Sequence, residues 1–413
     1  MNLSYLKKNI LTIIAGTYPL LMATSILFAE ILSIVLILVS FFFLRGKIFL
    51  FFKNYYIKIL IIFFLYLIFN SLLISKNISL SLERSLPFIR FILLIVAFSF
   101  LTFEKKIIKI ELLINLWSIT LLFLNLDLVY QYYNSENKDL FGFQSPYPGR
   151  LSGIMGEEMK IALILYGFGS IIISYFAFKK KFNQLIIFSF ITLIGVFLTN
   201  ERSNILKLIF ILFFFFIFLK NMNFKKKIFI FFLTSFIILF FLTLHKPSYQ
   251  RFVKEKIFNQ FSYQDLKNKN FIEAISNSNY GQTFFLAYNI FIDNIVFGVG
   301  QKTFRVECQK YINTLKYYNP QLPTCSTHPH NTIIEIASEL GLIGILIFFF
   351  IMYLVIFKLI RKNKHKDFNL MLGPILFMIS QTLLPLPSGS FFTNYFAIIF
   401  WLNFAFVFKF LKN

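Results

Sequence analysis

Long apolar runs separated by short polar segments make up most of the chain. Runs of roughly 16 to 25 apolar residues have the length of a helix that crosses a bilayer. Such runs predict spans at residues 9–26, 28–44, 56–75, 87–103, 108–130, 160–178, 183–199, 204–219, 228–244, 335–358, 368–386 and 391–408. The pattern therefore predicts an all-α polytopic membrane protein with about twelve transmembrane helices, in which residues 1–413 form a single membrane domain.

Two polar segments are long enough to hold structure of their own, at residues 131–159 and 245–331. The second separates the ninth predicted span from the tenth. Because structureless loops of that length are uncommon, we expect helices within it. Apolar residues at helical spacing, such as Phe284, Tyr288 and Ile292, predict amphipathic helices that lie on the outer surface.

Basic side chains gather in alternate connecting segments. With the N-terminus in the cytoplasm, each cytoplasmic segment carries at least two Lys or Arg residues, as the positive-inside rule expects. We therefore predict that both termini are cytoplasmic and that residues 131–159 and 245–331 face the periplasm. The net charge of +23 also raises the question of nucleic acid, but the charges form short clusters rather than one patch. Topology explains them better, and no nucleic-acid partner is expected.

Composition excludes several function classes. The chain is 58% hydrophobic and 14% charged, which is too apolar for a soluble domain of 413 residues. It contains no D-x-D pair, no G-x-x-x-x-G-K loop, no H-E-x-x-H motif and no Cys-His zinc spacing. ATP-driven transport and metal-dependent transfer from sugar nucleotides lose support, and no metal or cofactor is predicted. The first apolar run continues past the length of a signal-peptide core, so we expect no cleaved leader.

The junction between the long loop and the tenth span carries the candidate base. Pro329 favours an extended approach for His328, and Thr332 with Glu335 matches the T-x-x-E capping pattern. The helix should begin just after His330, with its positive end disfavouring the protonated ring. A neutral imidazole beside an anionic site suits a general base. The alternative is a loop with two solvated histidines above an ordinary membrane helix.

Two glycines follow in the same predicted span. Gly341 and Gly344 form a spot of small residues where another helix can approach closely.

Arginine is concentrated on the side predicted to be exterior. Six of the arginines in the chain fall there: Arg84, Arg90, Arg150, Arg202, Arg251 and Arg305. Lysine otherwise predominates, and the rigid guanidinium fork suits bidentate contact with phosphate. A structural ion pair is the alternative for each of them.

These features resemble a known family. His330-Asn331, followed after nine residues by Gly341 and after two more by Gly344, matches the signature of the O-antigen ligase and polymerase superfamily of bacterial membrane glycosyltransferases. Three further stretches resemble it: 149–158 with Arg150, 198–203 with Arg202, and 287–300 with its Gly-x-Gly turn.

The resemblance implies a GT-C-like helical membrane fold in which His330 is catalytic. It implies that Arg150 and Arg202 hold the diphosphate of a lipid-linked sugar donor. Tyr280 stands where the family has arginine, and Arg305 is a candidate replacement. Possible supporting residues are Glu158, His328 and Asn331.

The only two cysteines, Cys308 and Cys325, both lie in the long loop. An oxidising exterior would let them form a disulfide that closes the segment leading to His328. Two unpaired thiols are the alternative.

The predicted reaction is metal-independent, inverting transfer of a glycan from a polyprenyl diphosphate carrier to a lipid A core hydroxyl at the periplasmic face of the bacterial inner membrane. Within the enzyme class, a polymerase that extends the glycan on its carrier and an oligosaccharyltransferase that acts on protein hydroxyls remain open. A lipid-linked sugar transporter belongs to another class, but its polar sites would lie near the bilayer midplane. Here they lie at the ends of spans. Besides donor and acceptor, the expected partners are membrane lipids.

Overall fold

A computed structural model of the chain describes residues 3–44, 53–147, 149–220, 222–228, 233, 280–315, 320, 324–361 and 367–411. Within these ranges every regular element is a helix. Seven helices are long and apolar enough to cross a membrane: Ile26–Leu44, Tyr55–Ile74, Ile78–Glu104, Ile110–Tyr133, Ile161–Phe178, Thr332–Lys358 and Asn394–Leu411. The all-helical prediction is confirmed for this part of the chain.

The helices follow the apolar runs closely. The first half of the chain forms α1 (Leu3–Gly16), α2 (Tyr18–Thr24), α3 (Ile26–Leu44), α5 (Tyr55–Phe69), α6 (Ile78–Ser85), α7 (Ile89–Ser99), α8 (Ile110–Tyr133), α9 (Ile161–Phe178), α10 (Phe182–Leu198) and α11 (Arg202–Phe218). The second half forms α16 (Gly281–Asp293), α17 (Phe304–Glu307), α18 (Thr332–Arg361), α19 (Phe368–Thr382) and α20 (Asn394–Leu411).

Two of the predicted spans need comment. The run at residues 9–26 is divided between α1 and α2, because Pro19, in the first turn of α2, cannot donate a backbone hydrogen bond to α1. The span at 228–244 lies mostly outside the described residues, as does much of the segment 245–331. Since α10 and α19 are shorter than a full span, the number twelve stays a prediction.

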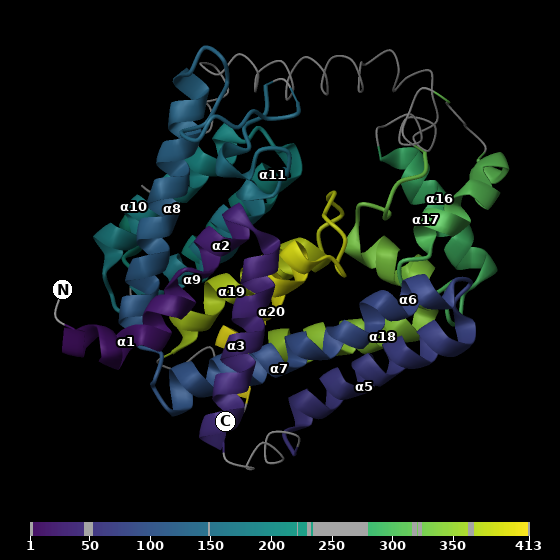
Figure 1. Ribbon diagram of the computed structural model, residues 1–413, viewed down its shortest axis with the longest axis horizontal. Helices are drawn as coiled ribbons and strands as arrows, with labels where there is room; N and C mark the ends of the chain where they lie inside the picture. The colour runs from purple at the N-terminus through teal and green to yellow at the C-terminus, as the bar shows by residue number, and fades with distance from the viewer. Residues whose placement is uncertain are drawn as a thin grey trace.

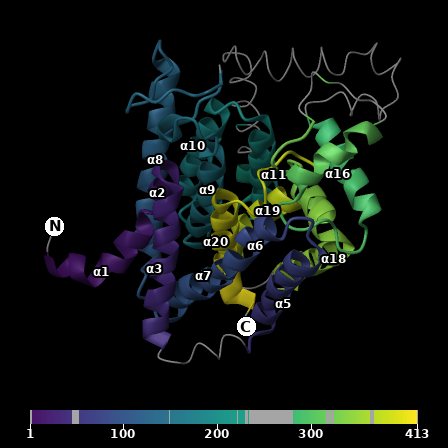
Figure 2. The same ribbon diagram turned by 45° about the vertical axis from the view of Figure 1, so that its right-hand side comes forward.

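Helix α9 is the centre of the bundle. Every residue from Ile161 to Ala177 is buried, and α8, α10, α19 and α20 pack around it (Figures 1 and 2). Glycines permit this close packing: a Cβ at Gly373 of α19 would lie 2.2 Å from the carbonyl oxygen of Ser170. The amide of Gly373 instead donates to the Ser174 hydroxyl across 2.8 Å.

Helix α18 is broken at Gly341, where φ is 66° and ψ is −166°. The loop after α16 enters the break: the Leu342 amide donates to the Ile295 carbonyl at 2.7 Å, and the Val299 amide donates to the Ser338 carbonyl at 3.1 Å. These bonds satisfy backbone groups that the break would leave open. At Gly341 itself the close neighbour is this loop, while helix α5 packs beside the same spot, where the Tyr66 hydroxyl donates to the Leu340 carbonyl at 2.5 Å.

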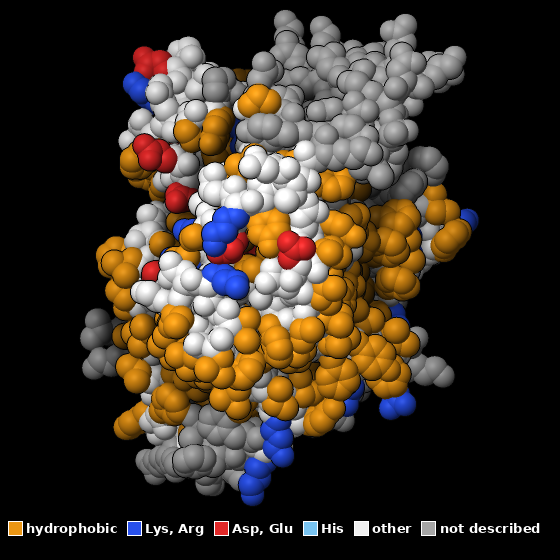
Figure 3. Space-filling model, turned by 90° about the vertical axis from the view of Figure 1, so that its right-hand side faces the viewer, with side chains coloured by type: hydrophobic (Ala, Val, Ile, Leu, Met, Phe, Trp, Pro, Cys, Tyr) orange, Lys and Arg blue, Asp and Glu red, His pale blue; other side chains and the backbone are white. Residues whose placement is uncertain are grey.

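Apolar side chains cover the outer face of α5 and α18. Ile62, Leu65, Leu346 and Tyr353 are each more than half exposed. Figure 3 shows a broad hydrophobic band on this side of the molecule, with Lys and Arg along its lower edge. A helix bundle that contacts lipid needs such a band between polar ends.

Candidate active site

A cavity of about 600 Å³ lies where one end of α9 and α11 meets the segment before α18 and the connection from α19 to α20. Its charged lining comes from Arg150, Lys160, Glu201 and Arg202, and its imidazoles are His328 and His330. The opposite ends of α9, α11 and α18 carry Lys179, Lys220 and Lys358. The structure thus brings four of the predicted site residues to one cavity: Arg150, Arg202, His328 and His330.

His330 is held in an uncommon conformation. Its φ is 57°, in the left-handed region that few non-glycine residues adopt, and its carbonyl accepts a hydrogen bond from the Ser388 amide at 2.7 Å. Its ring lies 4.8 Å from that of Tyr280 and 4.2 Å from that of His328, centroid to centroid. Burial, with the positive charge of Lys160, lowers the pKa of His330 from 6.5 to about 4.

His328 uses both ring nitrogens structurally. Nε2 lies 3.3 Å from the Ser388 carbonyl oxygen, which can only accept, so Nε2 carries the hydrogen. Nδ1 then accepts from the Thr327 hydroxyl at 3.0 Å. Burial, aided by the charges of His330 and Lys302, lowers the pKa of His328 to about 3. Within the described residues neither ring nitrogen of His330 has such a partner, so His330 is the better placed of the two to accept a proton.

The start of α18 differs from the predicted capping pattern. Asn331 is the cap: its side-chain oxygen accepts from the amides of Ile333 at 3.0 Å and Ile334 at 3.2 Å. The Thr332 hydroxyl bonds the Gln381 carbonyl at 3.0 Å instead. Glu335 is buried and turned inward. The helix begins where the sequence predicted, but the Thr332–Glu335 box was wrong because both side chains are used in tertiary contacts.

Glu335 of α18 hydrogen-bonds to the connection between α19 and α20, part of which lines the cavity. Its carboxylate accepts from the Ser390 hydroxyl and, at 2.8 Å, from the Phe391 amide. The Lys302 ammonium also donates to the Ser390 hydroxyl at 2.8 Å, and burial lowers the pKa of Lys302. Lys302 and Glu335 thus hold Ser390 and Phe391. Ser388, two residues earlier, hydrogen-bonds to both histidines. No motif in the sequence pointed to Lys302, whose partners come from distant segments.

Arg150 is fixed by a buried carboxylate. Its guanidinium lies 3.2 Å from Glu201, whose side chain is only 8% exposed, and it lies over the ring of Tyr147 at 5.2 Å. Burial raises the pKa of Glu201, and the charges of Arg150 and Lys160 oppose that shift. Arg202 follows directly at the first turn of α11 and also lines the cavity.

A chain of polar contacts continues from Glu201 into the bundle. The Asn204 amide donates to Glu201, and the Tyr166 hydroxyl donates to Asn204 at 3.1 Å. The Gln381 amide reaches the Tyr166 hydroxyl at 2.5 Å, and Lys207 donates to Gln381 at 3.1 Å. Sequence reasoning missed these residues, because isolated polar positions within apolar runs carry no spacing signal. Their shared position near one end of the spans was the only available clue.

The remaining candidates lie elsewhere. Arg305 is exposed and donates to the Thr327 carbonyl at 3.5 Å without lining the cavity. Glu158 is also exposed and outside the lining. Arg90 forms an ion pair with Glu30 at 3.0 Å, which is the structural alternative considered for it. Arg251 lies outside the described residues.

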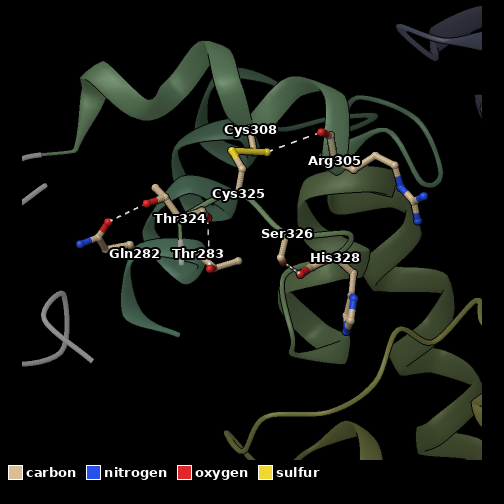
Figure 4. Close-up of a disulfide and its surroundings, with 8 residues drawn as sticks. All are labelled: Gln282, Thr283, Arg305, Cys308, Thr324, Cys325, Ser326 and His328. Atoms are coloured by element: carbon tan, nitrogen blue, oxygen red, sulfur yellow. Dashed lines mark hydrogen bonds between the residues drawn. A yellow bond between two sulfur atoms is a disulfide. The ribbon is translucent and has the colours of Figure 1, made fainter. Parts of the chain in front are cut away.

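A disulfide joins Cys308 to Cys325, whose Cα atoms are 5.7 Å apart. The bridge links the helical turn after Arg305 to the irregular segment that runs toward His328 (Figure 4). Thr324 adds a contact with α16, since its carbonyl accepts from the Thr283 hydroxyl at 3.2 Å. The approach to the two histidines is therefore anchored on the α16 side of the cavity.

A protein-family model described as O-antigen ligase matches residues 187–349. A search of curated proteins finds no significant match to the chain. The matched stretch runs from α10 into α18 and contains Arg202 and His330, while Arg150 and Lys160 precede it. The match confirms the resemblance on which the site was predicted. The long apolar helices of the chain fit an integral membrane protein. Residues 187–349 are therefore similar to the O-antigen ligase family, which agrees with the resemblance found in the motifs.

Proposed function

We propose that the chain is a membrane glycosyltransferase of the O-antigen ligase type. It transfers a glycan from a polyprenyl diphosphate carrier to a lipid A core hydroxyl at the periplasmic face of the bacterial inner membrane. The observation that carries the proposal is the single cavity that unites Arg150, Arg202 and His330. The family match supports it independently, because members of that superfamily act on lipid-linked glycans.

The donor requires stabilisation of charge at its leaving group. When the bond between the anomeric carbon and the diphosphate oxygen breaks, its electron pair leaves with the diphosphate. Arg150 and Arg202 face the same cavity and can share the negative charge that develops. Since diphosphate is already a good leaving group, it does not need to be protonated by the enzyme.

The acceptor requires a base. Its hydroxyl oxygen attacks the anomeric carbon from the side opposite the diphosphate, so the configuration inverts. Its proton passes to a ring nitrogen of His330, which releases it to solvent after the product leaves. General-base catalysis of this kind contributes about 10²–10⁴-fold. The low pKa of His330 keeps the ring unprotonated before the acceptor arrives.

Reconstituted transfer tests the proposal. Purified protein in lipid is mixed with an oligosaccharide on polyprenyl diphosphate and with lipid A core. His330→Ala should lower transfer by about 100-fold or more at normal protein abundance, and Arg202→Glu should abolish donor binding. Arg84→Gln, at a partly exposed arginine paired with Glu83 outside the cavity lining, is the control. Undiminished transfer by His330→Ala would overturn the proposal.

The products of the same assay distinguish the related reactions. A glycan joined to lipid A core identifies a ligase. A longer glycan that is still attached to polyprenyl diphosphate, formed when a second donor replaces the core, identifies a polymerase instead. Transfer to a peptide hydroxyl would identify a protein oligosaccharyltransferase.

A further inference from the structure

We propose that Lys160 is a third cation of the donor site, and that binding of the donor diphosphate is coupled through Lys160 to the basicity of His330 in the same cavity. This inference rests on the proposed function of the cavity. It adds a residue that no motif indicated, and it gives that residue two roles that can be measured separately.

The first argument is position. Lys160 directly precedes α9, where its carbonyl accepts the first helical hydrogen bond, from Ile164. Its side chain is half-buried and lines the cavity beside Arg150 and Arg202. Because α9 is the most enclosed helix of the bundle, the backbone at Lys160 is held firmly. The ammonium group is therefore presented to the cavity from a rigid element.

The second argument is charge balance. The lining carries three cations, Arg150, Lys160 and Arg202, against one carboxylate, Glu201. Glu201 is already paired with Arg150 at 3.2 Å. A surplus of positive charge in a half-enclosed cavity is unfavourable unless an anion occupies it. A diphosphate supplies at least two negative charges, which matches the surplus that remains after the Glu201 pair.

The third argument is the relation between Lys160 and the imidazoles. The Lys160 charge acts on His330 and His328, and it opposes the raised pKa of Glu201. The groups that face His330 are Tyr280 from the residue before α16 and His328 from its own segment, with Lys160 across the cavity. Of these, Lys160 is the one that a bound anion can neutralise.

A consequence follows for the order of events. In the empty site, burial and, to a lesser extent, the charge of Lys160 both disfavour a positive charge on His330. When the diphosphate offsets the Lys160 charge, the Lys160 part of that penalty is removed and the ring becomes a stronger base. His330 is therefore a stronger base toward the acceptor hydroxyl when the donor is in place.

The test compares Lys160→Met, which removes the charge at similar length, with Lys160→Arg, which retains it. For Lys160→Met the donor KM should rise about tenfold, as expected for one lost charge-assisted contact. The acid limb of kcat/KM, which reports the free enzyme, should move to higher pH because His330 loses a repelling neighbour. Lys160→Arg should show neither change. Lys138→Met, at a partly exposed lysine paired with Glu136 outside the cavity lining, is the matched control.

A second readout does not depend on turnover. The chain contains only four histidines, so NMR titration of labelled histidine can follow His330 directly, with His330→Ala assigning its signal. The His330 pKa should rise in Lys160→Met. An unchanged or lowered pKa, or an unchanged donor KM, would overturn the inference.

These outcomes separate the two proposals. If His330→Ala transfers glycan normally, the function proposed for the cavity fails, and this inference fails with it. If His330→Ala is inactive while Lys160→Met behaves like wild type in KM and pKa, only the role of Lys160 fails.

Discussion

At the residue scale, the base candidate is defined by its surroundings. His330 and His328 are neighbours in sequence and in space, yet only His328 has both ring nitrogens engaged, by Thr327 and Ser388. The same Ser388 holds the His330 backbone through its amide. Both rings line the cavity, and Ser388 of the α19–α20 connection engages the ring of His328 but only the backbone of His330.

The arginines should be sensitive to shape as well as charge. Arg202→Lys keeps the positive charge but loses the planar fork that contacts two phosphate oxygens at once. We expect kcat/KM for the lipid-linked donor to fall about tenfold or more, which corresponds to about 1.4 kcal/mol. The measurement is initial-rate kinetics with Arg84→Lys as control. Equal kinetics for wild type and Arg202→Lys would show that no bidentate contact is made there.

Buried neutral histidines should also make stability depend on pH. The pKa values of His328 and His330 are lowered to about 3 and about 4 from 6.5. Below pH 6.5 the unfolded chain therefore binds more protons than the folded one, so stability falls as the pH drops toward 4. Thermal unfolding in detergent should show this slope, and His328→Asn should reduce it. A slope unchanged by the substitution would contradict the buried, neutral state of His328.

Sequence reasoning reached His330, Arg150 and Arg202 because each sits in a motif or on an unexpected side of the membrane. Lys160 could not be singled out, since lysine is common throughout the chain. The pairing of Glu201 with Arg150 was equally hidden, because it joins residues from two different connections.

At the element scale, we expect stability to be most sensitive to substitution at the break in α18. A Cβ at Gly341 would lie 2.5 Å from the Val296 carbonyl oxygen, and its φ of 66° disfavours other residues. Gly341→Ala should destabilise the protein by about 2 kcal/mol or more. Gly389→Ala, where the nearest atom is 3.9 Å away, is the control. Thermal unfolding of the two variants measures the difference. Equal stability of Gly341→Ala and Gly389→Ala would contradict the break in α18 at Gly341.

The disulfide should matter to activity through the segment it closes. Cross-linking a loop of this size stabilises by about 3 kcal/mol in the chain-entropy model. Replacing Cys308 and Cys325 together by serine should lower stability and transfer activity, and reducing agent should slow the wild type but not the double variant. Activity that is indifferent to both treatments would show that the approach to His328 is ordered without the bridge.

Apolar run length predicted most helices in the described residues, because membrane spans are specified by hydrophobicity over their whole length. The same signal does not register the break at Gly341, since the average hydrophobicity of residues 335–358 stays high across it. The insertion of residues 295–299 depends on backbone contacts between segments far apart in sequence, and no local pattern encodes it.

At the scale of the whole molecule, the cavity lies at one end of the bundle and lysine-rich turns lie at the other. We expect cysteine introduced at Lys138 to react with a membrane-impermeant maleimide in intact inner-membrane preparations that expose the periplasmic side. Cysteine at Lys180, an exposed turn residue between α9 and α10, should react only after permeabilisation. The reverse pattern would place the cavity in the cytoplasm and remove the proposed function.

Convergence of the distant motifs is the property that sequence alone left open. Residues 149–160, the start of α11 and the segment before α18 come together because α9 packs against α10, α19 and α20. Their resemblance to one family implied a shared site, but only the packing brings their side chains to one cavity.

The most direct test is a structure of the protein with a polyprenyl diphosphate sugar bound in lipid. The account predicts the two phosphates within hydrogen-bond distance of Arg150 and Arg202, with the anomeric carbon on the side of His330. Phosphates bound outside this cavity, or a sugar directed away from His330, would contradict it.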